Sequence, residues 1–206
     1  GQGSDGGAAR LEALVDALVF ERVIVPIDVE PDPRVTGVHA GENGHNPIDF
    51  VRAQTPAGEA LAIYSSAQAL SAHRPGDRPM ALDFRTIGLT ALVETGPGTD
   101  AVLLPRPAVA ALAQGDEWLP AWRDGSLREL LLAEATAACP AIVDIDIAYA
   151  GEGLTRVLVA VDRASFAQGA DASAMKETLS AALNAVGANP RLIASADRVE
   201  IAPVLR

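Results

Sequence analysis

The sequence predicts an α+β protein with two small domains, each a mixed or antiparallel sheet covered by helices. Amphipathic stretches with helical spacing are interspersed with short β-rich stretches that come in pairs joined by glycine or proline. The composition changes at residues 116–126, where aromatic, proline and charged residues gather. We therefore expect a disordered tail at 1–7, a first domain at 8–115, a linker at 116–126 and a second domain at 127–206.

In the first domain, apolar residues that recur every three or four positions predict a helix at 8–20. Residues 31–47 are rich in Pro, Gly and Asn and predict a long exposed loop, whereas residues 50–66 predict a hairpin. The remaining predicted elements are strands at 22–27 and 101–105, an extended segment at 80–84, and helices at 67–72, 86–94 and 107–114.

The second domain begins with a predicted helix at 127–138. A first hairpin, a helix that ends at Gly187 and a second hairpin at 191–204 follow it. In the first hairpin, strict alternation places one apolar set on the covered face and leaves Asp144, Asp146 and Arg156 on the other, where we expect them to pair. The predicted apolar set is Val143, Ile145, Ile147, Tyr149, Val157, Val159 and Val161.

Charge and composition exclude several classes of protein. The formal net charge is −11 and the basic residues are scattered singly, so we expect no nucleic-acid partner. Charged residues interrupt every apolar run before it reaches the roughly 20 residues that cross a bilayer, so we expect no membrane span. The single cysteine, Cys139, permits no intramolecular disulfide and no zinc cluster, which favours the reducing cytoplasm.

Several motifs resemble reactive sites but lack the required context. Residues 1–6 spell G-x-G-x-x-G, yet no strand precedes them as a dinucleotide site requires. His39, Glu42 and His45 have ligand spacing for zinc, but they fall in the predicted loop and have no evident fourth ligand. The S-x-x-K motif at 173–176 lacks its partner motifs. The sequence therefore predicts no catalytic residue, no cofactor and no metal site.

Trp118 and Trp122 are the residues that stand out most in the predicted linker. They are two of only eight aromatic residues, and four positions separate them around Pro120. Buried aromatic side chains dominate the energetics of many interfaces, so this pair is a candidate partner-binding site. The alternative is that the two rings wedge the domains together.

Two segments carry a resemblance to a known family. A hairpin that ends in an aromatic residue and Ser is followed by a short helix, as at Ile63, Tyr64, Ser65, Ser66 and Leu70. A strand and helix then close the unit, from Leu103, Leu104 and Pro105 through Leu112. This pattern resembles the N-terminal domain of the SseB-like family, named for enhanced serine sensitivity. From Leu127 onward the chain is similar to the C-terminal domain of many bacterial members. The resemblance implies no catalytic residues.

Together these observations favour a non-enzymatic protein-interaction or regulatory protein of the bacterial cytoplasm, with an unidentified protein partner. The alternative is a small-ligand-binding protein or enzyme with a pocket between the domains. The residues considered for that pocket are Tyr64, Ser65, Arg74 and Asp83.

Overall fold

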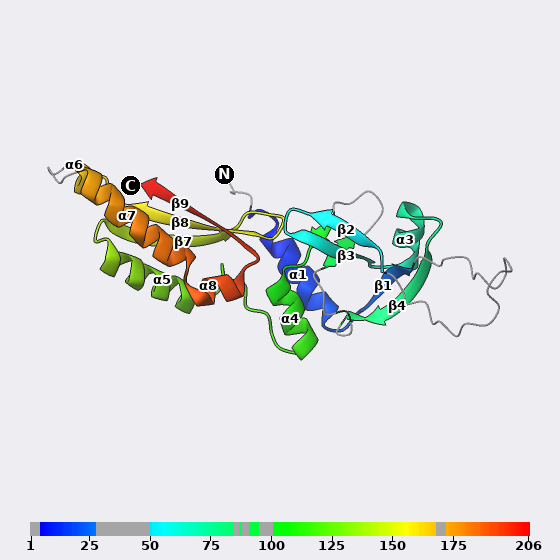
Figure 1. Ribbon diagram of the computed structural model, residues 1–206. Helices are drawn as coiled ribbons and strands as arrows, with labels where there is room; N and C mark the ends of the chain where they lie inside the picture. The colour runs from blue at the N-terminus through cyan, green and yellow to red at the C-terminus, as the bar shows by residue number, and fades with distance from the viewer. Residues whose placement is uncertain (1–4, 28–49, 85–86, 88–90, 95–100, 168–171) are drawn as a thin grey trace, which may run out of the picture.

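A computed structural model describes residues 5–27, 50–84, 87, 91–94, 101–167 and 172–206. It confirms the predicted α+β class: helices pack on two separate sheets, one mainly from each half of the chain (Figure 1). We call the described part of residues 5–114 the N-terminal unit and residues 125–206 the C-terminal unit. None of the described helices is both long and apolar enough to cross a bilayer.

The N-terminal unit has a mixed sheet with strand order β4-β1-β3-β5-β6, and β2 also pairs with β3. The strands β3 and β5 run parallel, whereas the other pairs are antiparallel. Its elements are α1 (Ala8–Leu18), β1 (Arg22–Ile27), β2 (Arg52–Thr55), β3 (Gly58–Tyr64), α3 (Ala67–His73), β4 (Arg78–Asp83), β5 (Ala91–Glu94), β6 (Val102–Leu103) and α4 (Arg106–Gln114).

Helices cover both faces of this sheet. The apolar stripes of α1 and α4 bury Leu11, Val15 and Leu112 against Ile63, as the helical spacing predicts. The alternate residues of β3 point the other way, where Tyr64 packs with α3. Among the described residues, the core on the α1 and α4 face is Ala8, Leu11, Val15, Leu18, Val23, Val25, Leu61, Ile63, Phe84, Val102, Leu104, Ala108, Val109 and Leu112, together with Tyr149 from the C-terminal unit.

The C-terminal unit has a three-stranded sheet in the order β7-β8-β9, with α5 and α7 on one face (Figure 1). The core between helices and sheet includes Leu127, Leu131, Ile145, Val157 and Val159. The elements are α5 (Gly125–Ala138), β7 (Ile142–Tyr149), β8 (Leu154–Val161), α6 (Ala164–Ala167), α7 (Ala172–Gly187), α8 (Pro190–Ser195) and β9 (Arg198–Leu205).

Two predicted elements are wrong. Residues 91–94, expected in a helix, form strand β5 between β3 and β6, so pairing to two neighbours overrides local preference. The expected hairpin at 191–204 is a helix followed by a strand. The Asn189 side chain accepts bonds from the Arg191 and Leu192 N–H groups and thereby begins α8, with proline at its first turn. The strand β9 then runs parallel to β8.

The predicted face of β7 is wrong at one residue. The register shifts between Ile142 and Asp144, as in a β-bulge, so that Ile142 is buried and Val143 is 53% exposed. The predicted pairing of Arg156 also differs, because Arg156 binds Glu200 on β9. Asp144 is instead held by Arg128 and Arg206.

Both edges of the C-terminal sheet carry a block against further strand pairing. On β7, the Arg128 side chain donates to the Ile145 carbonyl at 2.7 Å. On β9, the Arg206 N–H and carbonyl both bond to the β8 side, so by alternation the position of Pro203 faces the free edge. A proline there removes an N–H that a second strand would need.

We expect Pro203→Thr to increase self-association, because it restores one outward N–H donor, worth about 0.5–1.5 kcal/mol per ladder bond. Sedimentation velocity across a concentration series measures this change. Val204→Thr is the matched control, since the N–H of Val204 faces β8 by the same alternation. Equal association of both variants would contradict this explanation of Pro203.

Candidate functional site

The two units meet around the segment between α4 and α5, which contains no helix or strand. Pro120 and Ala121 are buried there, and the Arg123 N–H donates to the Pro120 carbonyl at 2.8 Å, which forms a tight turn. Asp124 follows and caps α5 by accepting from the Leu127 N–H at 3.0 Å. This turn directs the Trp122 side chain toward the junction.

Trp122 packs against the cores of both units. Its ring centroid lies 4.9 Å from that of Tyr149 and 5.7 Å from that of Trp118, which meets it edge-on. Its Nε1–H donates to Glu12 Oε1 on α1 at 2.6 Å. Trp122 therefore lies between the units, and Trp118 packs against the N-terminal core beside it. Their predicted role in binding a partner stays a prediction.

Glu12 joins α1 to the linker through two side chains. In addition to the bond from Trp122, the Arg123 guanidinium donates to both carboxylate oxygens, with Nη2 3.0 Å from Oε2. We call these contacts of Glu12 with Trp122 and Arg123 the Glu12 clasp. Partial burial alone would raise the pKa of Glu12, but the bonds from Arg123 and Trp122 outweigh it and hold the pKa below its ordinary value of 4.5.

A second polar contact joins the units between α4 and the turn before β9. The Asp197 carboxylate accepts from the Arg106 backbone N–H at 2.9 Å and from the Arg106 Nε at 2.6 Å. Its side chain is only 3% exposed. A carboxylate at the N-terminus of α4 is also stabilised by the partial positive charge of the helix end.

The glycines ahead of α1 take part in the junction. A Cβ on Gly6 would lie 2.4 Å from the Tyr149 carbonyl oxygen, and Gly6 has φ +65°, so only glycine fits this close approach. The Asp5 carboxylate accepts from the Gly7 and Ala9 N–H groups at 3.0 Å each. Asp5 thus occupies the donors that a phosphate at this glycine motif would need. Residues 5–7, expected in a tail, form a turn against β7.

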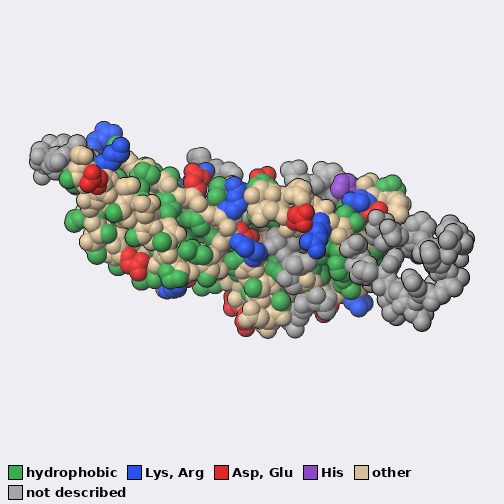
Figure 2. Space-filling model, viewed as in Figure 1, with side chains coloured by type: hydrophobic (Ala, Val, Ile, Leu, Met, Phe, Trp, Pro, Cys, Tyr) green, Lys and Arg blue, Asp and Glu red, His purple; other side chains and the backbone are tan. Residues whose placement is uncertain are grey.

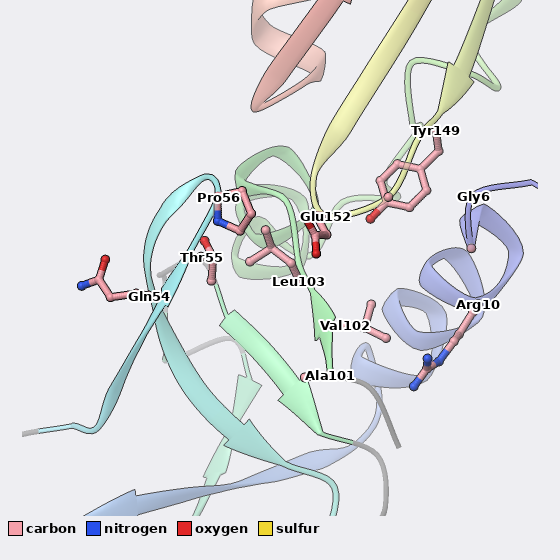
Figure 3. A pocket seen from close by; sticks show the side chains of 12 residues that line it. Gly6, Arg10, Gln54, Thr55, Pro56, Ala101, Val102, Leu103, Tyr149 and Glu152 are labelled. Atoms are coloured by element: carbon pink, nitrogen blue, oxygen red, sulfur yellow. The ribbon is translucent and has the colours of Figure 1, made fainter. Parts of the chain in front are cut away.

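A cavity of about 490 Å³ lies where the units meet (Figure 3). Four segments form its walls: the start of α1, the β2–β3 turn, the strand β6 and the β7–β8 turn. Arg10 lies across from Thr55 and Pro56, and the Tyr149 hydroxyl lies near Glu152 (Figure 3). The lining residues are Gly6, Gly7, Arg10, Gln54, Thr55, Pro56, Ala101, Val102, Leu103, Tyr149, Gly151 and Glu152.

Tyr149 is the most buried polar side chain of this cavity. Only 8% of the residue is exposed, and its hydroxyl accepts from the Gly153 N–H at 3.3 Å. Burial raises the pKa of Tyr149 above its ordinary value; the Gly153 bond acts against this rise, and the nearby charge of Glu152 adds to it. The hydroxyl therefore stays protonated at neutral pH and is available as a donor.

The residues that the sequence suggested for an inter-domain pocket do not line this cavity. Tyr64 is buried beside α3, and its hydroxyl lies 2.7 Å from the His73 Nδ1. Arg74 pairs with Asp77 instead. Sequence reasoning missed the lining residues because they come from four separate segments. The glycines on either side of Glu152 are a local signal of a special turn in the sequence.

The other motifs fall into ordinary surroundings or outside the described residues. His39, Glu42 and His45 lie outside them. Among the described residues, no three His, Cys, Asp or Glu side chains cluster as metal ligands would. Cys139 is fully buried at the end of α5. Burial alone would raise the pKa of Asp144, but Arg206 and Arg128 outweigh it and keep that pKa low.

We expect Trp122→Phe to lower the free energy of unfolding by about 2 kcal/mol more than Trp118→Phe does. The reason is that Trp122→Phe removes the hydrogen bond to the charged Glu12 side chain. Trp118 is the matched control. Its Nε1 is buried without a hydrogen-bond partner among the described residues, so phenylalanine there removes an unsatisfied donor. Urea denaturation measures both variants, and an equal or larger cost at Trp118 would contradict the assigned geometry.

We expect the stabilising effect of Glu12 to depend on pH. Since folding lowers its pKa below 4.5, its contribution is fully present above that value and is lost as pH falls through the folded pKa. Glu12→Gln should therefore be less stable than wild type at neutral pH, and the gap should narrow in acid. Denaturation midpoints at several pH values between about 3 and 7 test this. A gap that widens in acid would contradict it.

Comparison with known proteins identifies the first half of the chain. The family model described as SseB protein N-terminal domain matches residues 3–111, which is more than half of the 206 residues. No curated protein and no solved structure matches significantly. The matched range contains the helices α1 and α3, the strands β1 to β6 and the first two thirds of α4. This chain belongs to the SseB family.

Proposed function

We propose that this protein is a non-enzymatic protein-interaction or regulatory protein, and that its partner binds at the linker. The observation that carries this proposal is the exposure of Leu119, which is 57% exposed between the half-buried Trp118 and the buried Pro120. Asp116 and Glu117 are exposed just before it. We call Asp116, Glu117 and Leu119 the linker strip.

The linker strip is suited to binding because its neighbours are anchored. Trp118 and Trp122 pack into the junction, and Trp122 bonds to Glu12, so the backbone on either side of Leu119 is held in place. A preorganised segment loses little conformational entropy when it binds. Burying an exposed leucine gains about 1.5–3 kcal/mol. The two tryptophans thus serve partner binding by holding the strip.

Charge indicates the kind of partner. The chain has a net charge of −11, and the linker strip adds two acidic side chains beside its leucine. A protein surface with basic side chains around an apolar pocket is complementary to that pattern. Lysine and arginine side chains are dispersed over the face seen in Figure 2, which supports a protein rather than a nucleic acid as the partner.

Two further observations support a cytoplasmic, non-enzymatic member of the bacterial family. The single thiol, Cys139, is buried and needs no disulfide partner. Asp144, one of the two aspartates of β7, is paired with Arg128 and Arg206, which hold its carboxylate ionised. We also propose that residues 127–206 correspond to the C-terminal domain of the family, and that the division at residues 116–126 separates two domains.

The small-ligand alternative also has an observation in its favour, which is the cavity at the junction. Its volume of about 490 Å³ falls within the range of about 300–1,000 Å³ for small-molecule sites. Its walls come from both units, as expected of a site between domains. It lies apart from the linker strip in the sequence and shares no residue with it.

We expect Leu119→Asp to weaken binding of a partner identified from the native host by at least about tenfold, because an apolar contact is replaced by a charge. Ile193→Asp is the matched control, since Ile193 on α8 is also 57% exposed. Dissociation constants of the purified pair measure the effect, and binding should weaken as salt rises. Equal dissociation constants for the two variants would refute the proposal that the partner binds at the linker strip.

A further inference from the structure

We propose that the junction cavity is a binding site for a hydroxylated carboxylate of the sugar-acid class. This site is independent of the linker strip and needs no protein partner. Three groups on its walls carry the assignment: a hydrogen-bond donor, an acceptor beside it and a cation on another wall. These are Tyr149, Glu152 and Arg10.

The donor is the Tyr149 hydroxyl. The residue is 8% exposed, lines the cavity and accepts a bond from the Gly153 N–H, but its own hydrogen has no acceptor among the described residues. Buried donors in native structures are nearly always satisfied. A ligand oxygen in the cavity would satisfy this one.

The acceptor is the Glu152 carboxylate. Glu152 lies in the β7–β8 turn with φ +50°, a left-handed conformation that is unfavourable for glutamate, between two glycines that also have positive φ. This turn places its carboxylate beside the Tyr149 hydroxyl (Figure 3). No direct bond joins the two groups. A ligand hydroxyl between them could accept from Tyr149 and donate to Glu152, because a hydroxyl group is both an acceptor and a donor.

The cation is Arg10, in the first turn of α1 on another wall of the cavity. A guanidinium matches a carboxylate in charge and in planar geometry. Val102 lies between Arg10 and the Tyr149–Glu152 pair (Figure 3), and it supplies apolar surface for a carbon chain. A carboxylate on a hydroxylated chain therefore matches the three polar groups and the wall between them.

Three six-carbon probes test separately whether the site requires a carboxylate and whether it requires hydroxyl groups. Gluconate carries a carboxylate and hydroxyls, hexanoate only the carboxylate, and sorbitol only hydroxyls. In calorimetric titrations of the full chain, we expect gluconate to bind at least about tenfold more tightly than either of the others, because each lacks one set of bonds. Absence of gluconate binding at concentrations up to about 20 mM, or equal binding of all three, would overturn the proposal.

Two variants assign the groups. Arg10→Gln should lower the affinities for gluconate and for hexanoate by similar factors, about tenfold, and should leave the affinity for sorbitol unchanged. Arg22→Gln, at an exposed arginine on β1 outside the cavity, is its control and should alter none of them. Tyr149→Phe should instead lower the affinity for gluconate more than that for hexanoate, because hexanoate has no hydroxyl for Tyr149 to bind.

Circular dichroism checks that the Tyr149 variant is folded, and Arg10→Gln tests the site without altering a buried side chain. Unchanged gluconate affinity in Arg10→Gln would overturn the assignment. Because the titrations use the purified protein alone, their result does not depend on the linker strip. A negative result in these titrations would therefore not count against the proposed protein partner, which the Leu119→Asp experiment tests separately.

Discussion

The position of Trp122 between the two cores is the constraint on which the rest of the structure depends. Its ring contacts both cores, and its only polar atom bonds to Glu12 on α1, 110 residues away in the sequence. A hydrogen bond to a carboxylate stabilises an indole N–H that is partly removed from water, so the ring and the helix hold one another in place. With α1 fixed, Gly6 meets the end of β7 and the four walls of the cavity come together.

Directional polar contacts hold the orientation of the two units at their junction. The Glu12 clasp joins α1 to the linker, and the Asp197–Arg106 contact joins the two units; each pairs a carboxylate with backbone or side-chain donors. Bonds of this kind are directional, and they lose strength quickly when the angle changes. The linker strip and the cavity are therefore positioned by the same set of contacts, although they expose different chemistry.

Periodicity in the sequence predicts much of this fold, because local spacing determines which helix face is buried. The spacing of Leu11, Val15 and Leu18 predicts α1, and a hairpin is predicted where β2 and β3 form. Periodicity fails where pairing with a strand distant in the sequence determines the structure, as in β5. It also fails at α8, where the capping residue Asn189 starts a helix in an apolar run expected to form a strand. No local pattern brings Tyr149 toward Arg10, since only the packing of the two units does so.

Calorimetry of the full chain tests the coupling of the two units most directly. If Trp122 joins both cores, the wild type should unfold in one transition whose calorimetric and van't Hoff enthalpies agree. Trp122→Ala should then split this into two transitions, one for each unit. Two separate transitions in the wild type, or a single unchanged transition in the variant, would contradict the account.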